Sequence, residues 1–344
     1  LPVGRMRNVL SKIGDTFSAD KPVHGAGVER TLIVCDKPNW SYDSILKSLS
    51  KYSPDSSLEW DVTYIKGARP WPKILEPKYG TRFFMGWQLL GDLQDGAIIQ
   101  KFPSLDPSKI LTGIHSHRAW DNLNTLPGKD VPPPSILLDF LSKYRGVNVV
   151  SRRLYSLFKN SGLTSLSYTP NGVDIQLFTP TSPINSDGPL RVGFSGTPKH
   201  NWLKGIDEFI KPACASPEIQ LKLAMPQNNK HVPLQQMPQF YNEIDVYLCA
   251  SSSEGFSQSV LEASACGRPV ISTRVGGSTD LIEDGINGFL VDRNIDAIRE
   301  KVEYFVANRE KVIEMGEANR RIVVERWSWA KRAPAWINFI QNHL

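Results

Sequence analysis

The feature that most constrains this chain is an alternation of short apolar runs, rich in β-branched residues, with amphipathic stretches of helical length. The alternation occurs once in each half of the sequence. It is typical of parallel sheets that are covered by helices on both faces. Because the 344 residues are about twice an ordinary domain, we expect an α/β fold with two Rossmann-like domains facing a cleft.

The expected elements follow the apolar runs along the chain. In the first half we expect strands at 31–35, 62–65, 97–100, 110–114, 147–150 and 165–168, and helices near 42–51, 135–144 and 152–159. In the second half we expect strands at 191–195, 220–224, 246–249, 270–273 and 289–291, and helices near 205–211, 258–266 and 295–306.

A turn at 169–174 and a proline-rich segment at 179–189 mark the junction between the halves. We therefore expect a first domain at 1–175 and a second at 176–326. The remaining residues, 327–344, are expected to form a helix that packs back on the first domain. The alternative to packing is that this segment contacts a membrane surface, because 326–340 contains three tryptophans and several basic residues. The same alternative holds for an amphipathic stripe at 5–17.

Composition narrows the partners and the compartment. The net charge is only +5 and no basic run occurs, so nucleic acid is not expected as a partner. The four cysteines are far apart in apolar surroundings, which favours reduced thiols in a cytosolic protein. No apolar run is long enough for a membrane span or a signal segment, so we expect a cytoplasmic protein, with peripheral contact at the inner membrane face left open. The oligomeric state cannot be inferred.

The residues that carry chemistry are concentrated between 253 and 269. Glu254 lies in the loop after the strand at 246–249, on the edge of the sheet where ligands of open α/β folds bind. Ser257 is placed to cap the next helix, so that the amides of its first turn, with Gln258 and Ser259, could hold a diphosphate. Glu254 and Glu262 could then accept hydrogen bonds from the hydroxyls of a sugar and of a ribose. The alternative is that two solvated glutamates have this spacing by chance.

The stretch from Glu254 to Glu262, with Ala-Cys-Gly-Arg-Pro-Val-Ile-Ser-Thr at 265–273 and Val-Gly-Gly-Ser-Thr-Asp at 275–280, resembles the donor half of retaining GT-B glycosyltransferases of family 4, the glycosyl transferases group 1. The similarity is close over about 190–330. The segment at 170–174 is also similar to the family's interdomain segment, whereas the first half is similar only in places. The resemblance implies that the domain at 1–175 binds the acceptor and that the domain at 176–326 binds a nucleotide sugar, with the C-terminal helix crossing back to the N-terminal domain.

The resemblance also implies roles for individual residues. Glu254 would contact the donor sugar near the reacting carbon, and Gly255 and Phe256 would approach it through their backbone. Glu262 would hold the ribose, and Lys204 would bind the diphosphate. Without the resemblance, a lysine before Gly205 is more simply a solvated side chain.

Two positions leave questions open. The family usually has an arginine after the glycine that ends the first strand of this half, but here Gly196 is followed by Thr197, and Lys199 could supply the missing charge. In the first half, His115 is similar in position to the family's active-site histidine. His117 is an equal competitor, and a structural histidine is the alternative.

The activity that the resemblance implies is a retaining transfer of a sugar from a nucleoside diphosphate to an acceptor hydroxyl. The expected acceptor is a saccharide or a lipid-linked saccharide, and a UDP-sugar is the expected donor, although no residue identifies the base. No metal and no further cofactor are expected, because the sequence contains no Asp-x-Asp motif. The rival hypothesis is a catalytically silent nucleotide-sugar-binding protein that acts as a sensor or assembly partner on the same fold.

Overall fold

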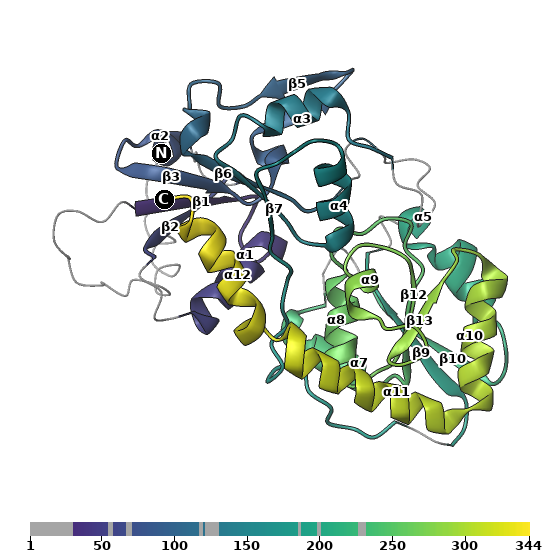
Figure 1. Cartoon of the computed structure of the whole chain (residues 1–344). Coiled ribbons are helices and arrows are strands. Elements are labelled where there is room, and N and C mark those ends of the chain that lie inside the picture. The colour runs from purple at the N-terminus through teal and green to yellow at the C-terminus, as the bar shows by residue number, and fades with distance from the viewer. Residues whose placement is uncertain are drawn as a thin grey trace, which may run out of the picture.

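The computed structural model describes residues 30–53, 58–66, 71–116, 120, 131–184, 187–197, 201–225 and 232–344. The amphipathic stripe at 5–17, His117 and Lys199 lie outside these residues. Within them, the chain forms two separate parallel sheets, one in each half, which confirms the expected α/β class (Figure 1).

The first half is built on a six-stranded parallel sheet with helices around it. In spatial order its strands are β2 (Trp60–Tyr64), β1 (Arg30–Cys35), β3 (Tyr79–Phe84), β6 (Ile110–Ile114), β7 (Gly146–Val149) and β8 (Leu166–Tyr168). Its helices are α1 (Ser41–Tyr52), α2 (Trp71–Leu75), α3 (Ser135–Leu141) and α4 (Arg152–Asn160), with short 3-10 turns at Trp87–Leu89 and Pro107–Lys109. Strands β1 and β6 are apolar and buried because both faces of the sheet are covered.

Two features of this half differ from the sequence prediction. The strand at 97–100 forms as β5 (Ala97–Gln100), but it pairs antiparallel with β4 (Gly91–Gln94) in a separate hairpin instead of joining the parallel sheet. Strand β3 was not predicted, because Arg82 interrupts its apolar run. The Arg82 guanidinium is buried and donates hydrogen bonds to three backbone carbonyls, including that of Ile74, so the charge is accommodated inside the fold.

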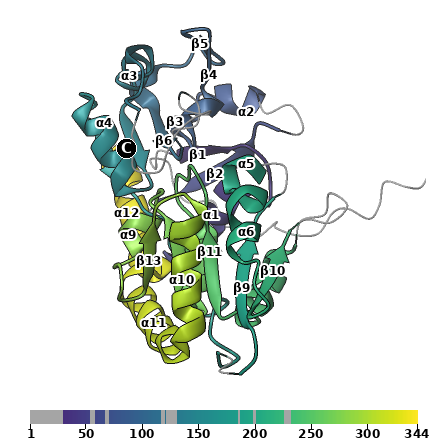
Figure 2. The ribbon, with the colours of Figure 1, turned by 90° about the vertical axis from the view of Figure 1, so that its right-hand side faces the viewer.

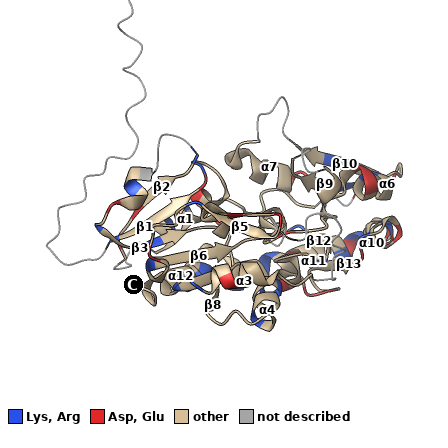
Figure 3. Ribbon diagram, turned by 90° about the horizontal axis from the view of Figure 1, so that it is seen from above, with Lys and Arg blue, Asp and Glu red and all other residues tan. Residues whose placement is uncertain are grey.

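The second half contains a five-stranded parallel sheet (Figure 2). In spatial order its strands are β10 (Ile219–Ala224), β9 (Leu190–Ser195), β11 (Val246–Cys249), β12 (Val270–Thr273) and β13 (Gly288–Val291). Its helices are α5 (Asn201–Lys204), α6 (Lys211–Ala213), α7 (Met237–Asn242), α8 (Gln258–Ala265), α9 (Ser278–Leu281), α10 (Ile295–Ala307) and α11 (Arg309–Ile322), with a 3-10 turn at Leu234–Gln236 and π-helical turns at Ile206–Ile210 and Val323–Trp327. Acidic and basic positions are interspersed over both halves (Figure 3).

The last helix, α12 (Trp329–Gln341), leaves the second half and packs against the core of the first. Trp336 is fully buried and its indole N–H donates to the Pro170 carbonyl, while Phe339 contacts Phe83 edge to face. The aromatic face of α12 is therefore covered by protein, so the alternative of a membrane-surface contact through this face is wrong. No helix in the described part of the chain is long and apolar enough to cross a membrane.

The two halves also meet at the Asp280 carboxylate of α9. It accepts hydrogen bonds from the backbone N–H of Arg152, at the start of α4, and from the Tyr168 hydroxyl at the end of β8. These bonds, at 2.8 and 2.9 Å, join the second half to the first.

Candidate active site

The strand order places a crevice in the second half. The chain runs from β9 outward to β10, then returns to the other side of β9 to form β11, so the two connections leave the sheet in opposite directions between β9 and β11. Ligands of open α/β sheets bind outside the carboxyl ends of the strands at such a point. The loops that start there are Gly196–Thr197 after β9 and Ala250–Ser257 after β11.

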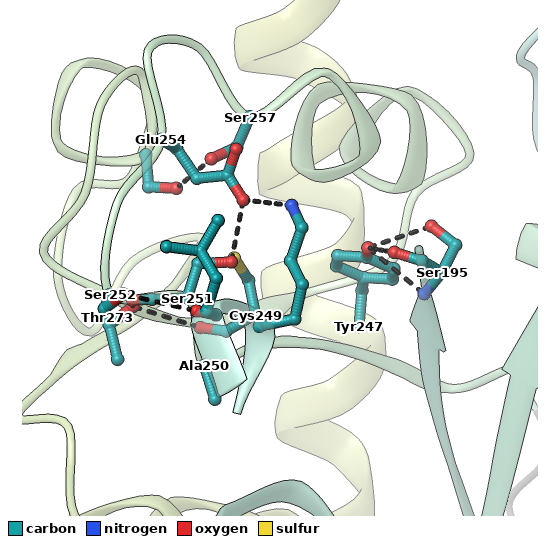
Figure 4. Close-up of polar contacts among 12 residues, drawn as sticks. Ser195, Tyr247, Cys249, Ala250, Ser251, Ser252, Glu254, Ser257 and Thr273 are labelled. Atoms are coloured by element: carbon teal, nitrogen blue, oxygen red, sulfur yellow. Dashed lines mark hydrogen bonds and ion pairs between the residues drawn. The ribbon is translucent and has the colours of Figure 1, made fainter. Parts of the chain in front are cut away.

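Glu254 and Lys204 contact each other in this crevice. The Lys204 ammonium donates to Oε1 of Glu254, and the Ser251 hydroxyl donates to the same oxygen at 2.7 Å (Figure 4). The side chain of Lys204 is 20% exposed and that of Glu254 is 16% exposed, so water screens their attraction weakly. The structure therefore brings together the two residues that were predicted to serve the donor sugar and the diphosphate.

The position of Lys204 depends on Arg293, which the sequence analysis missed. The Arg293 guanidinium donates to the carbonyls of Ala250, at the end of β11, and of Trp202, in α5, at 2.9 and 2.7 Å. It thereby ties the short helix that carries Lys204 to the strand that leads to Glu254. The sequence could have indicated Arg293, because it comes just after the strand at 288–291 and so lies at the edge of the sheet where ligands bind.

The loop at 254–255 is held between backbone segments that leave no room for a side chain at Gly255. A Cβ atom on Gly255 would lie 1.5 Å from the His115 carbonyl oxygen, and one on Gly276 would lie 2.5 Å from that of Glu254. Gly276 also has a φ of +42°, in the region that favours glycine. Two glycines thus let the Glu254 loop approach His115 in the first half.

His115 follows β6, at the carboxyl end of the first sheet, and is partly buried, with its ring centroid 4.9 Å from that of Tyr42. Burial lowers the pKa of His115 to about 4, and a hydrogen bond to the Met85 backbone opposes that shift only in part. The imidazole is therefore neutral at pH 7. Its Nε2 is buried without a hydrogen-bond partner among the described residues, and it lies against β6, where a Cβ atom on Gly113 would be 2.7 Å away.

Glu262, on α8, is buried and lines the cavity between the halves. Burial raises its pKa to about 7, although the Tyr241 hydroxyl donates to Oε2 at 2.9 Å and favours the ionised form. Ser195 lies 3.2 Å from the Tyr241 hydroxyl and 3.0 Å from that of Tyr247, so a chain of buried hydroxyls links Glu262 to the end of β9. Tyr241 is a second residue that the sequence analysis missed, because its partner lies 21 positions away.

The start of α8 differs from its prediction. Ser257 occupies the residue before the helix, but its side chain makes no capping hydrogen bond and instead accepts one from Ser278 at 3.4 Å. The ψ angle of 85° at Ser257 lies below the extended range usual for an N-cap. Gln258 donates to the Gly172 carbonyl at 3.1 Å and so fastens the helix to the interdomain segment, while Ser259 hydrogen-bonds to the Tyr247 hydroxyl.

Gly196 and Phe256 complete the set of expected residues. The amide of Gly196 donates to the Ala224 carbonyl at 3.2 Å, so it extends the sheet instead of pointing at an anion. Phe256 packs against the Trp327 ring, with centroids 5.8 Å apart, and lines the same cavity as Glu262. No cluster of three or more His, Cys, Asp or Glu side chains that could hold a metal ion occurs among the residues described.

The cavity has a volume of about 740 Å³ and is lined by both halves of the chain. The second half contributes Phe256, Gln258, Glu262 and the segment 232–235, and the first contributes one face of α1 with Lys47 and Lys51. Its volume lies in the range of pockets that hold small molecules and cofactors. The side chain of Glu262 thus lies at a cavity that both halves line.

Comparison with known proteins shows which family the second half of the chain resembles. Residues 223–322 match the family described as glycosyl transferases group 1. This segment, which runs from the end of β10 to α11, therefore resembles a group 1 glycosyltransferase domain. The resemblance drawn from Glu254, Glu262 and the glycine-rich segment after them is therefore confirmed at the level of the family.

Two solved structures share the fold over nearly the whole chain. Sucrose-phosphate synthase from Thermosynechococcus elongatus is 13% identical, with a TM-score of 0.70 that covers 92% of this chain and 99% of that one. The Anabaena protein HepE, solved in complex with UDP and glucose, is 14% identical, with a TM-score of 0.66 that covers 91% of this chain and 100% of that one.

Sequence similarity to curated relatives is confined to a shorter region. The GDP-mannose-dependent alpha-(1-6)-phosphatidylinositol monomannoside mannosyltransferase of Mycolicibacterium smegmatis is 32% identical over 109 residues, which cover 29% of this chain and 28% of that protein. The chain spans about a quarter of the length of the first curated relatives that it matches.

Proposed function

We propose that this protein transfers a glycosyl group from a nucleoside diphosphate sugar to an acceptor hydroxyl, with retention of anomeric configuration and without a metal ion. The observation that carries the proposal is the contact of Lys204 with Glu254 at the switch point of the second sheet, beside a cavity into which Glu262 faces. An ammonium suits a diphosphate, and two carboxylates suit two sets of hydroxyls.

Each residue has a distinct task in the proposed reaction. Lys204 binds the diphosphate, on which negative charge grows as the bond from phosphate to the sugar breaks. Glu254 accepts hydrogen bonds from the donor sugar, while Gly255 and Phe256 bring the backbone close to it. Glu262 holds the ribose, and Lys199 remains a candidate for a second phosphate contact.

The acceptor reacts from the side of the first half, next to His115, whose lowered pKa keeps the imidazole neutral at pH 7. The acceptor oxygen forms the new bond to the anomeric carbon on the face from which the diphosphate leaves. The acceptor proton passes to the departing phosphate oxygen, so no side-chain base is required. This step is taken from the family resemblance.

We propose a saccharide or a lipid-linked saccharide as the acceptor. A UDP-sugar remains the first donor to test, and HepE, which shares the fold, was solved with UDP. GDP-mannose is the second, because the Mycolicibacterium relative is named as dependent on it.

The experiment is a measurement of sugar transfer from labelled UDP- and GDP-sugars to water and to added glycosides. We expect at least slow hydrolysis with one donor, and near-complete loss of turnover in Glu254→Ala with the fold retained. Turnover at the wild-type rate in that variant would refute the assignment. Tight donor binding without any turnover would favour the silent sensor instead.

A further inference from the structure

Lys204 and Glu254 are each other's partners in this structure, although their proposed tasks concern two different parts of the donor. The ammonium that is proposed to bind the diphosphate donates to the carboxylate that is proposed to bind the sugar. Both side chains are mostly buried, so neither can leave the other at no cost in free energy. When the donor binds, the two side chains must therefore separate, or the donor must contact both of them while they remain paired.

The two parts of the donor have opposite effects on the pair. A diphosphate draws the Lys204 ammonium toward itself and brings negative charge next to Glu254, where water screens the repulsion weakly. A sugar supplies hydroxyl donors that can replace the ammonium at the carboxylate. A nucleoside diphosphate without its sugar has no such donors at this position, because its phosphate oxygens only accept.

Ser251 keeps the carboxylate in place during this exchange. Its hydroxyl donates to Oε1 of Glu254 at 2.7 Å, and its own carbonyl accepts a hydrogen bond from Thr273 at 2.6 Å (Figure 4). Glu254 is thus anchored to β12 by a contact that does not involve Lys204. When the ammonium turns to the phosphate, the carboxylate stays in the crevice, where it repels the diphosphate unless hydroxyls reach it.

We propose that the pair of Lys204 and Glu254 is an exchangeable counter-ion pair that makes the site favour a sugar-bearing donor over the nucleoside diphosphate left after transfer. The inference rests on the donor site proposed above. Glu254 serves as the internal anion of Lys204 until the diphosphate replaces it, and the sugar hydroxyls then compensate the carboxylate. Once the sugar has been transferred, that compensation is lost and the product is released more readily.

The test is a titration of UDP, GDP and inorganic pyrophosphate into the wild type and Glu254→Gln by calorimetry, with UDP-glucose and GDP-mannose as the matching donors. Glutamine keeps the size of the side chain and removes its charge. We expect Glu254→Gln to bind the nucleoside diphosphate and pyrophosphate about three- to tenfold more tightly. This is the range expected for an ion pair that is only partly exposed to water. Affinity for the matching sugar donor should rise less, so preference for the donor should fall.

Two further variants make the result specific. In the double variant with Lys204→Gln, replacing Glu254 should give a clearly smaller gain over Lys204→Gln alone, because it only relieves the repulsion between carboxylate and diphosphate and releases no ammonium. Glu283→Gln removes a carboxylate paired with Arg326 on the surface of the same half, and it should leave every affinity unchanged. Unfolding midpoints show whether each variant is folded.

Unchanged or weaker binding of both nucleoside diphosphates and pyrophosphate by folded Glu254→Gln would overturn the exchange. So would a gain that is as large in the Lys204→Gln background as in the wild type. A folded wild type that binds none of the nucleotides and none of the sugar donors would instead overturn the proposed function, and this inference with it.

Discussion

The buried carboxyl group of Glu262 should make the stability of the protein depend on pH. Burial raises its pKa from 4.5 to about 7, so the folded state binds this proton more tightly than the unfolded chain does. The stability associated with Glu262 is complete below about pH 4.5 and is lost as the pH rises to about 7. At 1.36 kcal/mol for each pKa unit, the loss amounts to about 3 kcal/mol.

The perturbation that isolates this effect is Glu262→Gln, which keeps the size of the side chain and cannot ionise. Urea unfolding of the wild type and the variant should be compared at intervals from pH 4.5 to pH 8. We expect the variant to gain stability relative to the wild type as the pH rises, by up to about 3 kcal/mol at pH 8. Taking the difference removes the contributions of other groups, such as His115, whose lowered pKa both proteins share.

The same carboxyl group should release a proton when nucleotide binds, because ribose hydroxyls favour its ionised form. Calorimetry at pH 6.5 in buffers of different ionisation enthalpy measures that proton, which Glu262→Gln should not release. Tyr241→Phe removes the hydrogen bond that favours ionisation, so it should move the stability transition to higher pH. A stability difference between wild type and Glu262→Gln that stays constant from pH 4.5 to pH 8 would refute the reasoning.

Three other substitutions test the residues that position the site and pack α12 on the first half. Gly255→Ala should nearly abolish sugar transfer, because its Cβ would lie 1.5 Å from a carbonyl oxygen of the first half; transfer at the wild-type rate would show that the loop can move aside. Arg293→Ala should lower stability by about 2 kcal/mol in urea unfolding and weaken pyrophosphate binding, since the helix of Lys204 loses its tie to β11, and unchanged binding would limit Arg293 to a structural role. Trp336→Ala should lower stability by about 3–5 kcal/mol, because a fully buried indole is removed, and a loss under 1 kcal/mol would contradict the packing of α12 on the first half.

The sequence predicted the strands best where both faces are covered. The runs at 110–114, 246–249 and 270–273 are buried throughout and contain no charged residue, and the structure has strands with those same bounds. Strand β3 could not be predicted in the same way, because the carbonyls that satisfy Arg82 are brought to it only by the folded chain.

The site was predictable to the extent that its residues lie at strand ends. Glu254 and His115 could be placed there because His115 directly follows an apolar run and Glu254 lies in the loop after another. The contacts that orient the site were not predictable, because they join distant positions: Arg293 binds a carbonyl 43 residues away, and Tyr241 binds Glu262 across 21. At Ser257 the sequence predicted a contact that does not form. Serine is a residue type suited to capping a helix, but here its side chain accepts a hydrogen bond from Ser278 instead.

The most direct test of the account is a crystal structure of the protein with the nucleoside diphosphate sugar that stabilises it most in thermal unfolding. We predict that the ribose hydroxyls hydrogen-bond to Glu262, that the diphosphate contacts Lys204, and that the sugar lies against Glu254 with His115 on its far side. A nucleotide bound with both glutamates turned away from it, or bound outside the cleft between the halves, would contradict the account.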